Sequence, residues 1–290
     1  MSWRTVVIAR SAKLDYQLGY LVVRREEVTK IHLSEIGLLL IESTAVSLTA
    51  ALLSELTKRK IKVIFCDEKR NPISELVSYY GSHDTSAKVR TQIDWTREQK
   101  AAVWTEIVTE KIRNQAEHLL HWKKEEASML YQYIDELEFG DATNREGHAA
   151  KVYFNALFGM DFTRTAENSL NAALNYGYGI ILSAFNREIV ANGYLTQLGL
   201  FHDNMFNPFN LGSDLMEPYR PLVDRKVKTI QPLKFEHEEK MHVLEVLQME
   251  VLLAGRREYV GNAIKIYCRS IFDALNSGDL SLIKFYKNEL

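Results

Sequence analysis

Hydrophobic and polar positions follow two different periods along the chain, and the change falls near residue 85. Before it, short apolar or alternating runs predict strands at residues 4–9, 18–24, 27–33, 36–42, 61–66 and 73–79. Residues 47–60 differ, because Leu48, Ala51, Leu52 and Leu56 recur at helical spacing. The first part of the chain is therefore predicted to be β-rich and to carry one helix.

From residue 86 the pattern is helical nearly to the end. Pro72 is the only proline before position 208, so no proline interrupts a helix between the two. The other prolines, at positions 208, 218, 221 and 232, mark one irregular stretch within the helical part. The pattern predicts an α+β protein, with a β-domain at residues 1–85 and an α-helical domain at residues 86–290.

Composition narrows the class of protein. The formal net charge of −2 gives no overall basic signature, so any contact with nucleic acid must depend on a local patch. The two cysteines, Cys66 and Cys268, form no disulfide framework and no CxxC pair, which favours a reducing, cytoplasmic compartment. The N-terminus lacks the apolar core of a signal peptide, and no apolar run is long enough to cross a bilayer. We therefore expect a soluble intracellular protein.

The first candidate for chemistry lies in residues 143–154. Thr143 and Glu146 match the capping box S/T-x-x-E, which would give Glu146 a structural role at the start of a helix. Glu146 also has the helical spacing of Ala150, Tyr153 and Leu157, and so shares their buried stripe. A buried carboxylate needs a partner or a metal, so both interpretations stay open.

Two further candidates lie in residues 199–224. A histidine beside apolar residues, such as His202, is more often a core or surface residue than a ligand. Ser213 fits a helix N-cap that places Asp214 in the first turn. Asp214 and Glu217 stand three residues apart, so both can face one point of a helix. Pro218 and the proline at position 221 would kink or end such a helix.

Together, Glu146, His202 and Glu217 form a set of one imidazole and two carboxylates. Such a set suits Mg²⁺ or Mn²⁺ better than zinc, and these ions assist phosphoryl transfer by polarising a phosphate oxygen. Periodicity does not show that the three residues converge. The histidine pair at positions 118 and 121 lacks an accompanying acid at a suitable spacing, and the pair at positions 237 and 242 has four intervening residues where HExxH has three, so both pairs are interpreted as ordinary polar faces.

Residues 86–124 are mildly basic, with eight lysines or arginines against five acids. Most of these cations are interpreted as a solvated helix face, and some as contacts to a duplex backbone. They are Lys88, Arg90, Arg97, Lys100, Lys111, Arg113, Lys123 and Lys124.

Four segments resemble motifs of the CRISPR-associated adaptation endonuclease and integrase family, and more closely its type II-A branch. Residues 145–154 resemble its first metal-ligand motif, residues 193–202 its histidine motif, and residues 213–224 its acidic motif D-L-x-E-x-[FY]-R-P-x-x-D. Residues 64–72 resemble the end of its β-domain. The four motifs occur in the family order, and the resemblance covers essentially the whole chain.

The resemblance implies that Glu146, His202 and Glu217 are catalytic residues that bind Mg²⁺ or Mn²⁺. Asp214 matches an acidic position that either binds the metal or holds a residue that does, and Arg220 holds the Glu217 segment or a phosphate.

Three further residues are implied to line the site or to contact DNA: Asn144, Tyr153 and Tyr176. The family relation also implies a fold, namely a small N-terminal β-sandwich-like domain with one helix, followed by a larger all-α catalytic domain.

The implied reaction is a transesterification that inserts short foreign DNA spacers into a CRISPR array. A 3′-hydroxyl of the spacer attacks a phosphodiester at the repeat boundary, and the family also cleaves branched DNA. The implied partners are double-stranded DNA, a second copy of the chain bound through the β-domain, and the small adaptation partner protein. The type II-A setting adds a ring-shaped DNA-end-binding protein and the RNA-guided effector nuclease.

Two other functions fit the same residues. A non-catalytic DNA-binding scaffold would use Glu146 only to cap a helix, so that alanine there costs about 1 kcal/mol of stability. A DNA-repair nuclease would cut branched DNA with no need for a repeat or a partner protein.

Overall fold

The computed structural model describes residues 4–78 and 82–288. The chain forms two compact units, Met1–Gly81 and Ser82–Leu290. Thr85, placed by the sequence at the end of the first domain, is the first residue of helix α2 (Thr85–Asp94) in the second unit.

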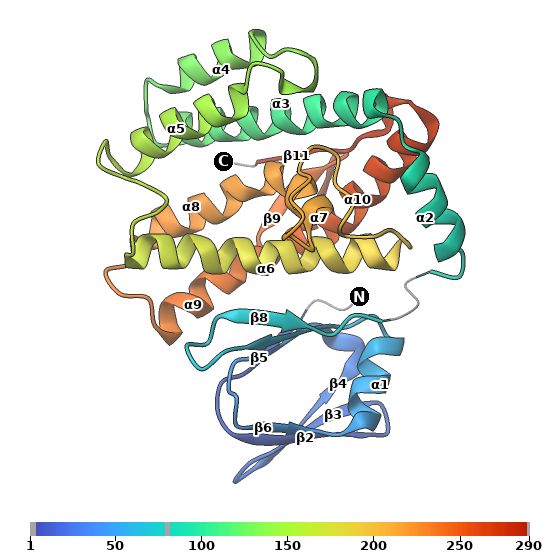
Figure 1. Cartoon of the computed structure of the whole chain (residues 1–290). Helices are drawn as coiled ribbons and strands as arrows, with labels where there is room; N and C mark the ends of the chain where they lie inside the picture. Colours follow the sequence, from blue (N-terminus) through green and yellow to red (C-terminus); the bar gives the residue numbers. More distant parts are fainter. Residues whose placement is uncertain (1–3, 79–81, 289–290) are drawn as a thin grey trace. The chain divides into compact units, whose positions relative to one another are not determined.

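Two four-stranded sheets form the first unit (Figure 1). The first sheet has the order β1-β5-β7-β8, with β1, β5 and β7 parallel. Its strands are β1 (Arg4–Ile8), β5 (Ile36–Ile41), β7 (Lys62–Cys66) and β8 (Pro72–Glu75). The second sheet has the order β4-β3-β2-β6. Its strands are β2 (Ala12–Gln17), β3 (Tyr20–Arg24), β4 (Val28–His32) and β6 (Val46–Leu48).

One hydrophobic cluster joins both sheets to helix α1 (Ala50–Lys58). Strand β5 reads as a nearly continuous apolar run because parallel neighbours flank it on both sides. Leu52 and Leu56 lie one helical turn apart on α1 and are fully buried against the sheet residues. Thr49 caps α1 by accepting a hydrogen bond from the backbone N–H of Leu52.

The strands and the helix of the first unit differ from the sequence prediction at four places. Leu18 and Gly19 have positive φ angles of 46° and 89° and form the tight turn between β2 and β3, so β3 starts at Tyr20 rather than at residue 18. The predicted helix at residues 47–60 starts only at Ala50, because Val46–Leu48 pairs with β2. Strand β2 was not predicted. The last predicted strand, at residues 73–79, is shorter in the structure, because β8 ends at Glu75, and residue 79 lies outside the described residues.

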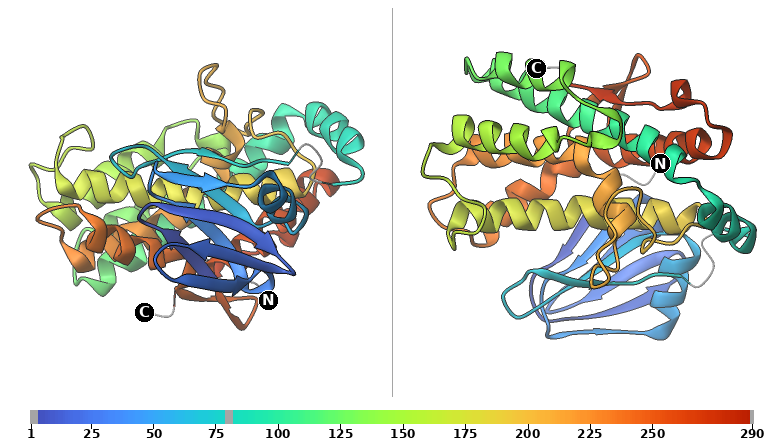
Figure 2. Two further views of the ribbon diagram at one scale, coloured as in Figure 1. Left: turned by 90° about the horizontal axis from the view of Figure 1, so that it is seen from below. Right: turned by 45° about the horizontal axis from the view of Figure 1, so that its top comes forward.

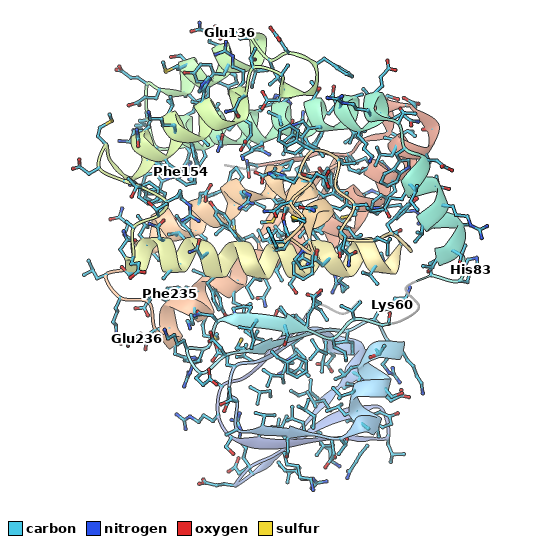
Figure 3. All side chains as sticks on the ribbon, viewed as in Figure 1. Lys60, His83, Glu136, Phe154, Phe235 and Glu236 are labelled. Carbon is cyan, nitrogen blue, oxygen red and sulfur yellow. The ribbon has the colours of Figure 1, made fainter. Side chains whose placement is uncertain are left out.

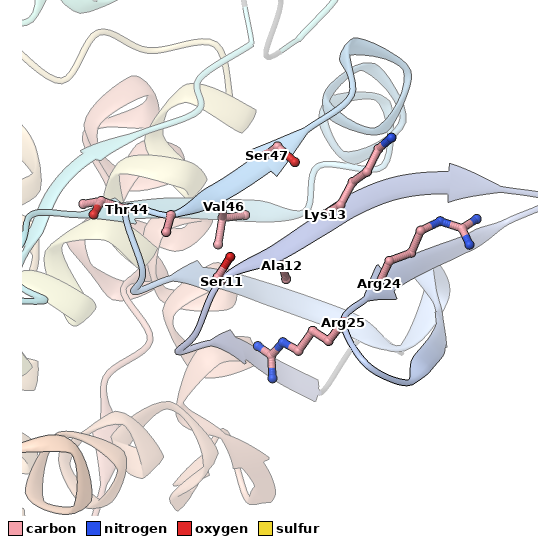
Figure 4. Close-up of a pocket in the computed structure, with 9 residues that line it drawn as sticks. Ser11, Ala12, Lys13, Arg24, Arg25, Thr44, Val46 and Ser47 are labelled. Atoms are coloured by element: carbon pink, nitrogen blue, oxygen red, sulfur yellow. The ribbon is translucent and has the colours of Figure 1, made fainter.

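An open surface pocket of about 480 Å³ lies in the first unit (Figure 4). The charged ends of Lys13, Arg24 and Arg25 point in different directions around it, and Arg24 pairs with Asp15 at 2.6 Å. The other lining residues carry hydroxyl or aliphatic side chains.

Helices dominate the second unit, and α3 (Arg97–His121) is the longest described in it (Figures 1 and 2). Helix α3 packs against α4, α5, α8 and α10, which makes it the centre of the unit. The other helices are α4 (Ala127–Asp135), α5 (Arg145–Phe158), α6 (Ser169–Ala191), α7 (Asn210–Leu215), α8 (Arg220–Ile230), α9 (His237–Leu244) and α10 (Val260–Ser277). Short 3₁₀ turns are η1 (Leu33–Glu35) in the first unit, and η2 (Phe139–Asp141), η3 (Glu217–Tyr219), η4 (Glu245–Gln248) and η5 (Leu280–Leu282) in the second.

The α+β class is confirmed, but the second unit is not all-α. It contains a three-stranded sheet of order β10-β9-β11, formed by β9 (Glu250–Leu253), β10 (Arg256–Tyr259) and β11 (Tyr286–Lys287). Ala254 and Gly255 have positive φ angles and form the turn between β9 and β10. Strands of two to four residues are too short for periodicity to reveal.

Gly177 allows α6 to approach α8 and α9 closely. A Cβ atom at Gly177 would lie 2.4 Å from Val223 Cγ1 and 2.9 Å from Val243 Cγ1, whereas a Cβ atom at Gly179 meets no atom within 4 Å. We predict that Gly177→Ala lowers the free energy of unfolding by about 1–3 kcal/mol through overpacking. Gly179→Ala, the control on the same helix, should leave it unchanged or raise it by up to about 1 kcal/mol. Urea unfolding of both variants tests this, and equal effects would contradict the packing account.

Candidate functional site

Glu146 lies in the first turn of α5 and faces the interior of the second unit. The predicted capping box of Thr143 and Glu146 is wrong: Asn144, at a left-handed φ of 54°, precedes the helix without a side-chain cap. The carboxylate of Asp141 accepts hydrogen bonds from the backbone N–H groups of Arg145 (2.6 Å) and Glu146 (3.2 Å) instead. The Glu146 carboxylate is therefore not used in capping.

Arg145 and Glu146 have different partners although they are adjacent. Arg145 pairs with Glu136 at 3.1 Å, and Glu136 lies at the outer end of the unit near α4 (Figure 3). Glu146 pairs with Lys111 of α3.

Glu217 begins η3, between α7 and α8. Ser213 was predicted to be an N-cap, but it lies inside α7, so this prediction is wrong. Pro218 and Pro221 occupy the first turns of η3 and α8, and they break the helix as the sequence predicts. The Pro218 carbonyl accepts hydrogen bonds from Asn114 Nδ2 (3.1 Å) and the hydroxyl of Tyr286 (2.9 Å), which fix the backbone next to Glu217.

The two carboxylates converge on one ammonium group. Glu146 Oε1 and Glu217 Oε2 both accept hydrogen bonds from Nζ of Lys111, and Glu217 Oε1 accepts one from Nε of Arg220 at 2.8 Å. The side chains of Lys111 and Glu217 are 6% and 5% exposed, against 26% for Glu146. Two acids from different helices thus meet at a nearly dry point that already carries a positive charge.

The pKa shifts follow from this arrangement. Burial alone would raise the pKa of Glu217, but Arg220 and Lys111 outweigh it and lower that pKa to about 2. Burial alone would lower the pKa of Lys111, but Glu217 and Glu146 outweigh it and raise it. Glu217 and Lys111 are therefore both charged at neutral pH.

Asp214 organises the loop that carries His202. Its carboxylate accepts hydrogen bonds from the backbone N–H groups of Leu200 (2.6 Å), Phe201 (3.0 Å) and His202 (3.2 Å), and pairs with His202 Nδ1. A Cβ atom at Gly199 would lie 2.3 Å from the His202 carbonyl oxygen, so this tight loop requires glycine. The bond to Asp214 raises the pKa of His202.

His202 keeps one ring nitrogen for a ligand. Asp214 holds Nδ1, which leaves Nε2 as the nitrogen that a metal would use. Trp104 of α3 stacks on Phe201 with ring centroids 4.6 Å apart and meets the His202 ring edge-on at 5.8 Å. Asp214 therefore orients the His202 ring, and its oxygens are already used by the loop.

A metal ion needs more ligands than now face one point. Within residues 4–78 and 82–288, no group of three or more His, Cys, Asp or Glu side chains is arranged to hold an ion. Glu146 and Glu217 do share one cation, Lys111, and carboxylates with an imidazole suit Mg²⁺ or Mn²⁺. The two carboxylates fit such an ion by the chemistry of their oxygens, and in the described ranges no third His, Cys, Asp or Glu side chain stands with them at the place that the Lys111 ammonium takes.

The remaining predicted residues are placed differently. Arg220 lies over the ring of Tyr178 at 4.7 Å and holds Glu217. Tyr153 is fully buried on α5, and its hydroxyl bonds to His118. The ring of Tyr176 packs at 5.6 Å from that of Phe235, which precedes α9 (Figure 3).

Sequence reasoning missed three polar residues of this unit. Lys111 was assigned to a solvated face, and His118 to a polar face, yet they are 5% and 2% exposed. Asp224 is also buried and accepts a hydrogen bond from the Tyr178 hydroxyl. The regular spacing of Trp104, Lys111 and His118, seven residues apart along α3, was the available signal that they share a face.

His118 belongs to an oriented hydrogen-bond chain. The indole N–H of Trp122 can only donate, so His118 Nε2 accepts from it at 3.0 Å. The neutral ring then carries its proton on Nδ1 and donates to the Tyr153 hydroxyl at 2.7 Å. Burial lowers the pKa of His118 to about 3, and burial raises the pKa of Asp224 to about 6, against the hydroxyls of Tyr178 and Tyr153.

These two residues should give pH dependences of opposite sign. The unfolded chain protonates His118 below about pH 6.5, while the folded chain keeps it neutral to about pH 3. Relative to His118→Gln, the wild type should lose about 1.4 kcal/mol of stability per pH unit as the pH falls through that range. The folded chain protonates Asp224 below about pH 6, and the unfolded chain does so only below about pH 3.8. Relative to Asp224→Asn, the wild type should therefore gain about 1.4 kcal/mol of stability per pH unit as the pH falls between these two values.

Urea unfolding between about pH 4.5 and 6.5 measures these differences, because all other groups titrate alike in the wild type and each variant. Two difference curves of the same sign, or two flat ones, would contradict the assigned protonation states.

Comparisons with known proteins agree with the architecture described above. The family model for CRISPR associated protein Cas1 matches residues 5–253. A CRISPR-associated endonuclease Cas1 from Neisseria meningitidis is 37% identical over 229 residues, which cover 78% of this chain and 75% of that protein. A casposase bound to an integration product shares the fold with a TM-score of 0.78 at 16% identity, covering 96% of this chain and 92% of that one.

A chain of a Cas6-RT-Cas1–Cas2 complex also shares the fold, with a TM-score of 0.76 at 19% identity. The match covers 100% of this chain but 36% of that longer chain. The structural likenesses show the fold, and the family match and the 37% identical relative show the descent. This chain belongs to the Cas1 family of CRISPR-associated proteins.

Proposed function

We propose that this chain is a metal-dependent DNA integrase and endonuclease that inserts short DNA spacers into a CRISPR array. The observation that carries the proposal is the convergence of Glu146 and Glu217, from α5 and η3, on one cationic point in a Cas1-family chain. Support comes from the name of the Neisseria relative, an endonuclease, and from the casposase that shares the fold and holds an integration product.

Glu146, Glu217 and Nε2 of His202 would hold Mg²⁺ or Mn²⁺. Such an ion, when bound, neutralises the charge that develops on the attacked phosphate. Arg220 keeps the Glu217 carboxylate ionised and oriented, and Asp214 keeps the His202 ring turned so that Nε2 stays available. The substrate step is attack of a spacer 3′-hydroxyl on a phosphodiester at the repeat boundary: the new P–O bond joins the spacer to the 5′ end of the repeat strand, the 3′-oxygen of the flanking strand departs and takes up a proton, and the attacking hydroxyl gives its proton to solvent.

The proposed partners are duplex DNA, a second copy of this chain and a Cas2-type protein. Cas2 is named with Cas1 in the complex that shares this fold, which supports the last of these. Assignment to the type II-A branch, with its ring-shaped DNA-end-binding protein and effector nuclease, is part of the proposal, as is the cytoplasmic compartment. No helix in the described ranges combines the length and the apolar character that a bilayer crossing requires.

A strand-transfer assay tests the proposed reaction. The chain, its small partner protein and a labelled short duplex are mixed with a plasmid that carries a repeat, in Mg²⁺ or Mn²⁺. We predict that Glu146→Gln, His202→Ala and Glu217→Gln reduce joining at least about a hundredfold, because each removes a ligand of the ion that stabilises the transition state. The control Glu245→Ala, which removes an exposed partner of Lys226, should join DNA like the wild type.

Each variant is first checked for folding by circular dichroism. Folded variants that join DNA as well as the wild type would overturn the assigned residues. A wild type that cuts branched DNA and never joins it would favour the repair-nuclease function instead.

A further inference from the structure

We propose that Lys111 is a built-in counter-ion that holds Glu146 and Glu217 together before metal binds, and that it competes with the metal for these carboxylates. This inference rests on the proposed function, because it assigns a role toward the same metal site. It goes further, because Lys111, which is not itself a metal ligand, would control the affinity of the site for metal.

The argument begins with the environment of the Lys111 ammonium. Its side chain is 6% exposed, and Nζ donates to one oxygen of each carboxylate. A buried ammonium is costly without partners, and here two acids supply them from α5 and η3. Nζ of Lys111 therefore lies between the two carboxylates that a divalent ion would join.

The two acids depend on Lys111 to different degrees. Glu217 is also held by Arg220 through its other oxygen, and its backbone is fixed at Pro218. Among the described residues, the Glu146 carboxylate pairs only with Lys111. Lys111 therefore keeps Glu146 turned toward Glu217, so that the two carboxylates stand near each other before any ion arrives.

The same contacts set up a competition. A divalent ion binds carboxylate oxygens at about 2.0–2.2 Å for Mg²⁺, so an ion shared by Glu146 and Glu217 would take the place of Nζ. Two cations at one point repel each other, and the ammonium must leave as the ion enters. Metal binding thus carries the cost of breaking both Lys111 ion pairs.

The experiment compares Mn²⁺ binding to the whole chain without DNA, by isothermal titration calorimetry and by thermal unfolding with and without Mn²⁺. Lys111→Met keeps the length of the side chain and removes its charge. We expect it to bind Mn²⁺ at least roughly tenfold more tightly than the wild type, because the competing cation is gone. Without Mn²⁺ it should melt at a lower temperature, because the partly buried Glu146 loses its partner and the buried Glu217 keeps only Arg220.

Three further variants make the result specific. Lys111→Arg retains the charge and should bind Mn²⁺ within a few-fold of the wild type. Lys226→Met makes the same substitution at the exposed pair with Glu245 and should match the wild type. If Lys111→Met does not fold without metal, Lys111→Gln removes the charge and keeps a hydrogen-bond donor, and the same tightening is expected.

Failure of this inference differs from failure of the proposed function. If the neutral variants bind Mn²⁺ no more tightly than the wild type, or if Lys111→Arg tightens binding equally, the counter-ion role is overturned. The metal site itself still stands in that case if Glu146→Gln and Glu217→Gln abolish binding. If neither the wild type nor any Lys111 variant binds Mn²⁺, the inference and the metal site fall together.

Discussion

Two carboxylates that meet one buried ammonium are the constraint on which the second unit depends. A buried charge without a partner costs several kcal/mol, so the buried Glu217 and Lys111 are tolerated in the interior only because Arg220 and the partly buried Glu146 complete the set of opposite charges. Each element that supplies one of these charges must be held in register with the others. The hydrogen bonds at the Pro218 carbonyl and the cap by Asp141 meet this requirement, since they fix the backbone beside each acid.

Helix α3 provides the register. Trp104, Lys111, Asn114 and His118 lie along one stripe of this helix, at spacings that bring them to one face. Trp104 packs against the His202 loop, and Lys111 bridges the two acids. Asn114 donates to the Pro218 carbonyl, and His118 bonds to the Tyr153 hydroxyl. One rigid helix therefore sets the distances among segments that lie up to about a hundred residues away, as the separation of 106 between Lys111 and Glu217 shows.

The sequence was sufficient for the α+β class, for the motifs and for the proline break after Glu217, because these depend on local pattern. It was insufficient where a distant partner changes the meaning of a residue. Lys111 looks like a solvated cation until an acid 35 residues later neutralises it. Thr143 looks like a cap until the left-handed Asn144 lets Asp141 take that role. A charged side chain considered with only its neighbours in sequence is expected to face solvent. Whether it is instead buried beside an opposite charge depends on the tertiary structure.

The candidate site is a product of the whole second unit rather than of its motifs. Tyr286 lies on β11, which pairs with β9 at the edge of a sheet that periodicity did not reveal, and its hydroxyl binds the same Pro218 carbonyl as Asn114 of α3. The segment that carries Glu217 is thus held between the central helix and a strand near the end of the described residues. Since a displacement of about 1 Å is enough to spoil a catalytic arrangement, residues that never contact a substrate can still determine whether the acids meet.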